Sequence, residues 1–369
     1  MDKKDIEILK RNLRYGNYFK CLPIKWDSVN ERIVVKSPWQ QRHVIPMLVI
    51  HLLATLCRLY SITLHPSNIM HRAEAIFGAL IYTIGLSIRL DIPVDHGAVQ
   101  VLNFVMISIK PTTSRSSTPN VYLLIRLLLY AVATTGFLLP TLMGVLAIFV
   151  PCQPILLNSL LYRNGIFLAG TSYSWIVRLL SAIVEFILLV NIAITSMHYV
   201  IEVMLKGVAF LWIDCKAFVK RYDQNLAKLG EYQNLRIFEK CLNSCTRSRI
   251  FLTCALGVPA AQIVICYIAI KLFRSNENDQ FKASLFLWCY FMIIFFTMIM
   301  FSGAAQVHNL SRNWLSRCRW NIKTKWERKV QKSLVPLKLE FGNNFVERLT
   351  PLVVQEFCVR QAISGLLVS

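Results

Sequence analysis

Residues 121–150 read VYLLIRLLLYAVATTGFLLPTLMGVLAIFV and carry a single charged side chain, Arg126. A helix needs about 20 predominantly apolar residues to cross the hydrocarbon core of a bilayer, so this stretch predicts a membrane-spanning helix. The rest of the chain agrees, because 55% of all residues are hydrophobic, 17% are charged and the mean hydropathy is +0.48. A soluble domain carries about 25% charged residues. The sequence therefore predicts a multi-span membrane protein.

Seven stretches are long and apolar enough to span a bilayer, at 44–64, 73–89, 121–150, 173–205, 250–270, 283–304 and 343–369. An eighth apolar stretch, 97–109, is too short to cross and is expected to form an interfacial or buried loop segment. The predicted fold class is all-α, with a seven-helix transmembrane domain over 44–369 that follows an N-terminal segment, 1–43.

The distribution of lysine and arginine predicts the orientation. These residues number 31 in the segments 1–43, 89–120, 206–249 and 305–342, and 5 in the segments 65–72, 151–172 and 271–282. Basic loops stay in the cytosol, so the N-terminus and the loops 89–120, 206–249 and 305–342 are predicted to be cytosolic. Seven spans then place the C-terminus outside the cell.

The remaining composition argues against several function classes. A net charge of +21 is explained by the cytosolic loops, so no nucleic-acid partner is expected. The sequence contains no Gly-x-Ser-x-Gly, His-Glu-x-x-His or P-loop motif, so no catalytic residue, cofactor or metal is predicted. Cys241 and Cys245 have a weak metal-ligand spacing and are expected to be reduced thiols.

The cytosolic N-terminus, the seven spans, the short outer loops and the long basic inner loops resemble the arthropod gustatory and odorant receptor superfamily. The lead-in to the first span, CLPIKWDSVNERIVVKSPWQ at 21–40, is also similar to receptors of that group. Gustatory receptors usually end with Thr-Tyr, five residues and Gln-Phe, and CVRQAISGLLVS at 358–369 lacks that pattern. The choice between the gustatory and odorant subfamilies stays open.

The resemblance implies a ligand-gated cation channel in the plasma membrane that detects small-molecule tastants or odorants. Such receptors assemble as tetramers of identical or related subunits around a pore lined by the seventh helix, and a ligand pocket opens to the outside among the other helices. The cytosolic ends of the later helices form an anchor between subunits. A G-protein-coupled-type receptor, a transporter and a membrane enzyme remain the alternatives, although G-protein-coupled receptors have the opposite orientation.

The last span contains the candidate pore residues. At about 100° per residue, Glu356, Arg360 and Ser364 form one polar stripe on a helix. Charged residues in a span face water or protein, so the stripe fits a water-filled path, while an ion pair that only holds helices together is the equal alternative. The apolar residues near the end of the chain could form a dewetting constriction, and they are Ile363, Leu366 and Leu367.

Aromatic and polar residues in the outer halves of the spans are candidates for the ligand pocket. They are Phe77, Tyr173, Trp175, Arg178, Trp288 and Tyr290. Trp and Tyr also gather at bilayer interfaces, so a belt or core position is the competing interpretation of each aromatic residue. Arg178 and Glu185 share one face of the fourth span and could form a functional or a structural ion pair. Residues 219–242 predict an amphipathic cytosolic helix that packs between subunits or lies on lipid.

Overall fold

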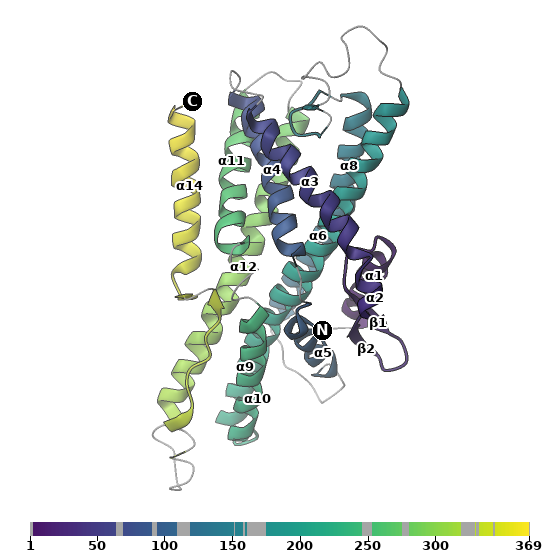
Figure 1. Cartoon of the computed structure of the whole chain (residues 1–369). Coiled ribbons are helices and arrows are strands. Elements are labelled where there is room, and N and C mark those ends of the chain that lie inside the picture. Colours follow the sequence, from purple (N-terminus) through teal and green to yellow (C-terminus); the bar gives the residue numbers. More distant parts are fainter. Residues whose placement is uncertain are drawn as a thin grey trace.

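The computed structural model describes residues 3–63, 69–90, 94–108, 119–150, 152–157, 159–160, 175–245, 253–274, 280–318, 329, 332–341 and 344–368, most of them in helices (Figure 1). The helices of the bundle are α3 (Val44–Thr63), α4 (Ile69–Arg89), α6 (Pro119–Phe149), α8 (Trp175–Ser196), α11 (Val258–Arg274), α12 (Gln280–Cys318) and α14 (Thr350–Val368). The other elements are α1 (Lys3–Tyr18), β1 (Ile24–Asp27), β2 (Arg32–Val35), α2 (Pro38–Gln41), α5 (His96–Ser108), the π-helices η1 (Met197–Leu205) and η3 (Thr253–Gly257), α9 (Lys206–Asp223), α10 (Leu229–Cys245), β3 (Glu340–Phe341) and β4 (Asn344–Phe345).

Within the described residues, five helical stretches are long and apolar enough to cross a membrane. They are Pro38–Thr63, Ile69–Arg89, Leu123–Phe149, Trp175–Asp223 and Gln280–Cys318, and each overlaps most of a span expected from hydropathy. The other two expected spans, 250–270 and 343–369, are occupied mainly by the helices α11 and α14. The chain is thus a helical membrane-type bundle, and seven crossings remain a prediction.

Two of the helices are much longer than a bilayer is thick. The continuous helix Trp175–Asp223 has 49 residues and α12 has 39, which correspond to about 74 Å and about 58 Å at 1.5 Å per residue. The hydrocarbon core measures about 30 Å, so both helices extend beyond it. Their ends form the lower part of the molecule together with α10 (Figure 1).

The segments expected to be cytosolic loops contain long helical stretches among their described residues. Residues 206–223 and 305–318 continue helices of the bundle, and α10 follows after a turn. The single helix expected over 219–242 is wrong, because the chain turns between Asp223 and Leu229 and Asn225 adopts a φ of 56°. Likewise, 97–109 is not a loop but lies mainly in the helix α5, whose apolar face packs against α10.

An aromatic cluster holds the lower extension together. Trp314 of α12 is 1% exposed, and its indole ring lies 4.9 Å from the ring of Phe218 and 4.6 Å from the ring of Tyr232. Tyr222 packs edge-on against the same indole at 5.2 Å. These rings come from α9, α10 and α12, so the three helices share one core below the bilayer-spanning part.

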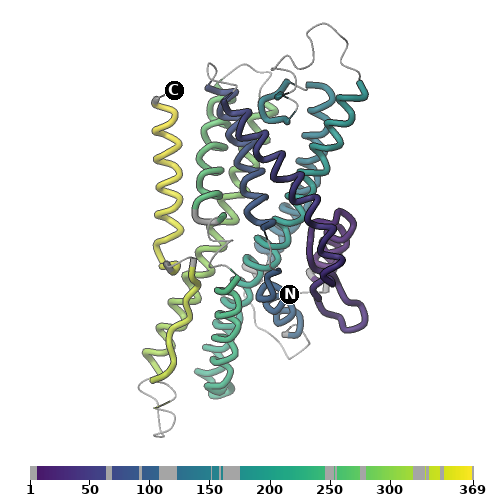
Figure 2. The backbone as a smooth tube through the Cα atoms, viewed as in Figure 1, coloured from purple at the N-terminus to yellow at the C-terminus, as the bar shows by residue number. Residues whose placement is uncertain are grey.

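The N-terminal segment folds as a small unit beside the bundle. Helix α1 packs on a hairpin in which β1 and β2 pair antiparallel, with Ile24 opposite Val35. The side-chain amide of Asn103 on α5 donates to the Ile33 carbonyl and accepts from the Ile33 N–H, both at 2.9 Å. Among the described residues, the mostly helical chain has two short hairpins, β1–β2 and β3–β4. Figure 2 shows this unit at one side of the bundle, near mid-height, and the C-terminus at the upper end.

The long helix α8–η1–α9 carries a buried charge pair at its centre. Lys206 donates to Glu202 one turn earlier, and both side chains are almost fully buried. They sit at the widened turns of η1, where Val203 and Met204 are 0% exposed. Widened π-turns occur mostly at functional positions in helices. This buried centre fixes the long helix in the middle of the core.

Candidate functional site

Helix α14 packs on the bundle through one face only. Cys358 and Ala362 are each 2% exposed, and they lie on the face that meets α11 and α12. Gln355 belongs to the same face: it accepts a hydrogen bond from the Gln262 side chain at 2.5 Å and donates one to the Thr297 hydroxyl at 2.9 Å. These amide contacts pin the last helix to its two neighbours, and Figure 1 shows it at the edge of the molecule.

The opposite face of α14 carries most of the candidate pore residues. Arg360 donates to Glu356 at 2.5 Å, one turn apart, and both side chains are more than half exposed. Ser364 is exposed on the same face, as are the apolar side chains Ile363 and Leu367. Leu366 differs, because it is half-buried. A helix face that pairs charges with large apolar side chains and touches nothing else in the described part of the chain is available to lipid, water or another subunit.

The candidate pocket residues do not gather in one place. Phe77 is buried and packs edge-on against Phe286 at 5.3 Å, and Tyr290 is half-buried in the same apolar cluster. Trp175 is 69% exposed and Trp288 is 49% exposed, which is typical of residues that face the bilayer interface. Arg178 is half-buried on α8. Tyr173 lies outside the described residues.

A buried ion pair that the sequence did not predict joins α3 to α8. Arg58 of α3 donates to the carboxylate of Glu185 on α8, and the two side chains are 1% and 3% exposed. The Tyr82 hydroxyl, from α4, donates to the same carboxylate at 3.3 Å. The Arg58 guanidinium also lies over the Tyr82 ring, 4.9 Å from its centre. Three helices therefore meet at one charge-assisted network.

The expected pairing of Glu185 with Arg178 is wrong. Seven residues apart on α8, these two side chains share a helix face in the sequence, but Glu185 turns into the bundle toward Arg58. A buried carboxylate needs a close cation with good geometry, and α3 supplies it. An arginine within the first span and a glutamate within the fourth were the available signals, since intramembrane charges tend to face the protein interior.

The network also holds a short segment that leads from α6 toward α8. Arg58 donates to the Ile155 carbonyl, and the Leu157 N–H donates to the second oxygen of Glu185 at 3.3 Å. Lys282 of α12 donates to Gln153 at 2.9 Å. The neighbouring Leu156 is 0% exposed. Residues 152–157 are thus inserted into the end of the bundle rather than lying over it.

Small and acidic neighbours complete this arrangement. Lys282 forms a second contact, at 2.8 Å, with the buried carboxylate of Glu74 on α4. A Cβ atom on Gly78 would lie 3.2 Å from Arg58 Nη1 and 3.4 Å from the Ile155 carbonyl oxygen, so the glycine permits the close approach. Among the described residues, no three His, Cys, Asp or Glu side chains gather as metal ligands.

Comparison with solved structures identifies the fold. The insect olfactory receptor OR5 from Machilis hrabei aligns with a TM-score of 0.65 at 11% sequence identity, over 98% of this chain and 98% of the receptor. The fold is that of an insect olfactory receptor. The same receptor in complex with eugenol aligns with a TM-score of 0.60 at 12% identity, over 99% of both chains. This agreement confirms, at the level of fold, the chemoreceptor resemblance that the sequence carries.

No family model matches the sequence, and no curated protein matches it. Both neighbours are receptors rather than enzymes.

Proposed function

We propose that the chain is a subunit of a ligand-gated cation channel in the plasma membrane that responds to a small-molecule odorant or tastant. The observation that carries this proposal is the olfactory-receptor fold over nearly the whole length of both chains. The complex of the neighbouring receptor with eugenol supports a small organic molecule as the class of ligand. Subunits would assemble as a tetramer of this chain alone or of this chain with related receptors.

In this proposal α14 lines the conduction path. Its free face combines Glu356, Arg360 and Ser364 with the apolar side chains Ile363 and Leu367. Four copies of that face around an axis would provide a polar stretch for ions and an apolar ring that dewets when the channel is closed. The opposite face of α14 would stay packed on α11 and α12 of its own subunit.

The ligand would bind among the outer halves of the spans. Phe77 and Tyr290 remain candidates for apolar contacts, and Arg178 for a polar one. The inserted segment 152–157 closes this end of the bundle and is tied to α3 and α8 through Arg58 and Glu185. Ligand entry would therefore have to displace or bypass that segment.

Whole-cell recording from cells that express this chain, alone and with related receptors, tests the function against a broad tastant and odorant panel. We expect an inward cation current that survives blockade of G proteins. A current lost on blockade would instead indicate a metabotropic receptor. The absence of any evoked current across the panel and all subunit combinations would contradict the channel.

The expected orientation has its own test. A tag at Met1 should be reached by antibody only after permeabilisation, and a tag after Ser369 should be reached on intact cells. Asn309 begins the sequence Asn-Leu-Ser, the one glycosylation sequon in the chain, and lies on α12 beyond its buried middle. We expect no glycan there because that end should be cytosolic. A glycan on Asn309 would show that the predicted topology is wrong.

A further inference from the structure

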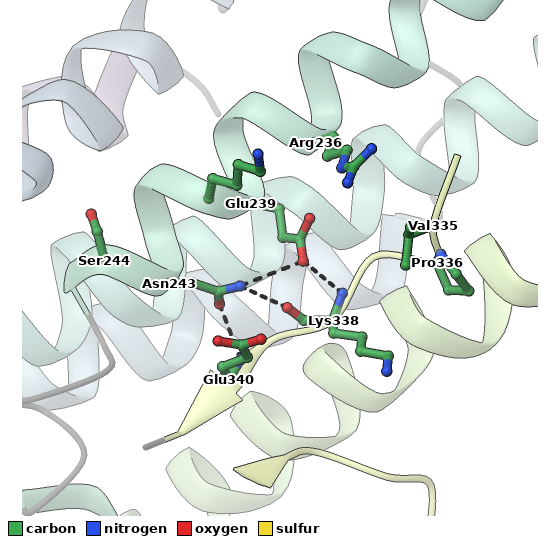
Figure 3. Close-up of a pocket in the computed structure, with 9 residues that line it drawn as sticks. Arg236, Glu239, Asn243, Ser244, Val335, Pro336, Lys338 and Glu340 are labelled. Atoms are coloured by element: carbon green, nitrogen blue, oxygen red, sulfur yellow. Dashed lines mark hydrogen bonds between the residues drawn. The ribbon is translucent and has the colours of Figure 1, made fainter. Parts of the chain in front are cut away.

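The chain between α12 and α14 includes an extended stretch that is packed in the protein interior. Residues 334–339 form neither helix nor strand, yet Leu337 is 0% exposed and Leu339 is 3% exposed. They lie between α10 and α12, as Figure 3 shows for the α10 side. An extended backbone that is buried must find hydrogen-bond partners, and here side chains of the two helices supply them.

Asn243 of α10 acts as a substitute for a neighbouring strand. Its amide nitrogen donates to the Lys338 carbonyl at 2.8 Å, and its amide oxygen accepts from the Glu340 N–H at 3.0 Å (Figure 3). One turn earlier, Glu239 accepts from the Lys338 N–H at 2.8 Å. Burial raises the pKa of the Glu239 carboxyl group, and the hydrogen bond from Lys338 opposes that rise.

Two further residues of α10 continue the row toward the start of the segment. The Tyr232 hydroxyl donates to the Val335 carbonyl at 2.9 Å, and Arg236 donates to the Ser333 carbonyl at 3.3 Å. All four residues lie at helical spacing along one side of α10. A cleft of about 460 Å³ opens beside the row. It is lined by Arg236, Glu239, Lys240, Asn243 and Ser244 of α10 and by Val335, Pro336, Lys338 and Glu340 of the extended segment.

Helix α12 holds the other edge of the segment. The Ser311 hydroxyl accepts from the Leu337 N–H at 3.0 Å, and His308 Nδ1 donates to the Leu337 carbonyl at 3.1 Å. The backbone N–H and carbonyl of Leu337 thus both bind α12, and the backbone N–H and carbonyl of Lys338 both bind α10. The alternation follows the two edges of an extended chain, so the segment is held as a central strand would be.

The contacts continue almost to the first residue of α14. The Val346 N–H donates back to the Leu339 carbonyl at 3.2 Å, next to the pairing of β3 with β4. Phe345 packs against His308, with ring centres 5.2 Å apart, and beneath the Lys338 ammonium group at 4.6 Å. Between this last contact and the first residue of α14 lies only the backbone from Val346 to Thr350. Four residues reach at most about 14 Å, so the start of α14 stays within that distance of Val346.

We infer that Asn243 and Ser311 are positioning residues for the last helix. They hold residues 333–340, here called the tether, in a fixed place between α10 and α12. The inference rests on the proposed channel, because the tether matters for conduction only if α14 lines the pore. Loosening the tether frees the start of α14, whereas the contacts of Gln355 deeper in the bundle remain. The cytosolic helices would in this way set the position of the pore helix.

Hydrogen exchange on the purified full chain tests the tether without any current. Asn243→Ala leaves the Glu340 N–H and the Lys338 carbonyl without their partner, so the peptide 333–341 should exchange at least about tenfold faster. Ser311→Ala removes the contact on the α12 side and should also speed exchange of this peptide. With two independent variants, the test still works if one of them fails to fold. The matched control is Asn234→Ala, an exposed asparagine on the same helix. Glu239→Gln keeps an acceptor for the Lys338 N–H and should not speed exchange.

The second measurement is gating. With surface amounts equal to wild type, Asn243→Ala and Ser311→Ala should shift the half-maximal ligand concentration by about fivefold or more, while Asn234→Ala should not. Unchanged exchange at 333–341 in both variants overturns the tether. Faster exchange with unchanged gating overturns the positioning role. A wild-type chain that gives no ligand-evoked current contradicts the proposed channel instead, and the exchange result still decides the tether.

Discussion

Arg58→Met should remove most of the protein from the cell surface. The change removes the guanidinium group from the buried Glu185 carboxylate, whose other partners among the described residues are the Tyr82 hydroxyl and the Leu157 N–H. It also removes the Arg58 donor from the Ile155 carbonyl. Removing one partner of a buried pair costs about 3–5 kcal/mol. That is a large share of a typical stability of about 5–15 kcal/mol. Surface labelling and thermal unfolding in detergent measure the loss.

The matched control is Arg178→Met, which removes an arginine from the same half of the bundle without touching the pair. It should cost far less stability. Arg58→Met combined with Glu185→Leu removes both charges and should recover most of the surface expression, because well-packed apolar residues can replace a buried pair. A single Arg58→Met variant as stable as Arg178→Met would show that the pair is not the link that joins these helices.

Changing the charge of Glu356 should alter permeation. If this carboxylate borders the conduction path in every subunit, Glu356→Gln should lower unitary cation conductance about twofold, since a negative ring concentrates cations. Glu356→Arg should lower it further and reduce the preference for cations over anions. Single-channel currents and reversal potentials in dilution gradients provide the measurement.

A charge swap separates the pore from an ion pair that only joins helices. Glu356→Arg with Arg360→Glu restores the pair but inverts its direction along the axis. Recovery of wild-type conductance in the swap would favour the structural pair, and altered conductance favours the pore. Glu7→Gln makes the same chemical change on α1, far from α14 in Figure 1, and should leave conductance unchanged. Normal conductance and selectivity in every Glu356 variant at normal surface levels would exclude this face from the pore.

The spans could be predicted because a bilayer forces each crossing segment to satisfy its own backbone. The expected start of the first span at residue 44 and the end of the third at 150 agree with α3 and α6 within a residue. Hydropathy could not show that α9 and the end of α12 continue as helices, because their exposed sides are polar outside the membrane. Within the segment 219–242, Leu235 and Phe238 are buried, but Leu226 lies in the turn and is 72% exposed.

The site was harder to predict than the spans because its pairs join distant parts of the chain. Arg58 and Glu185 are 127 residues apart, and Asn243 contacts Glu340 across 97 residues. A local rule can pair Glu185 with Arg178 or Glu356 with Arg360, and only the second of these pairs forms. Gln355 illustrates the same limit, because helical spacing alone cannot tell which face of the last helix meets α11.

The continuous helix from Trp175 to Asp223 connects the two ends of the molecule and can tilt as one rigid body. Its buried centre at η1 is a natural fulcrum, with about 20 residues, or about 30 Å, on either side. A tilt of about 5° about that point moves each end by about 2.5 Å in opposite directions, by the same helix geometry. One arm carries Glu185, and the other carries Phe218, which packs on Trp314. A rigid tilt of this helix would therefore move the Glu185 carboxylate and the rings around Trp314 in opposite directions at the same time.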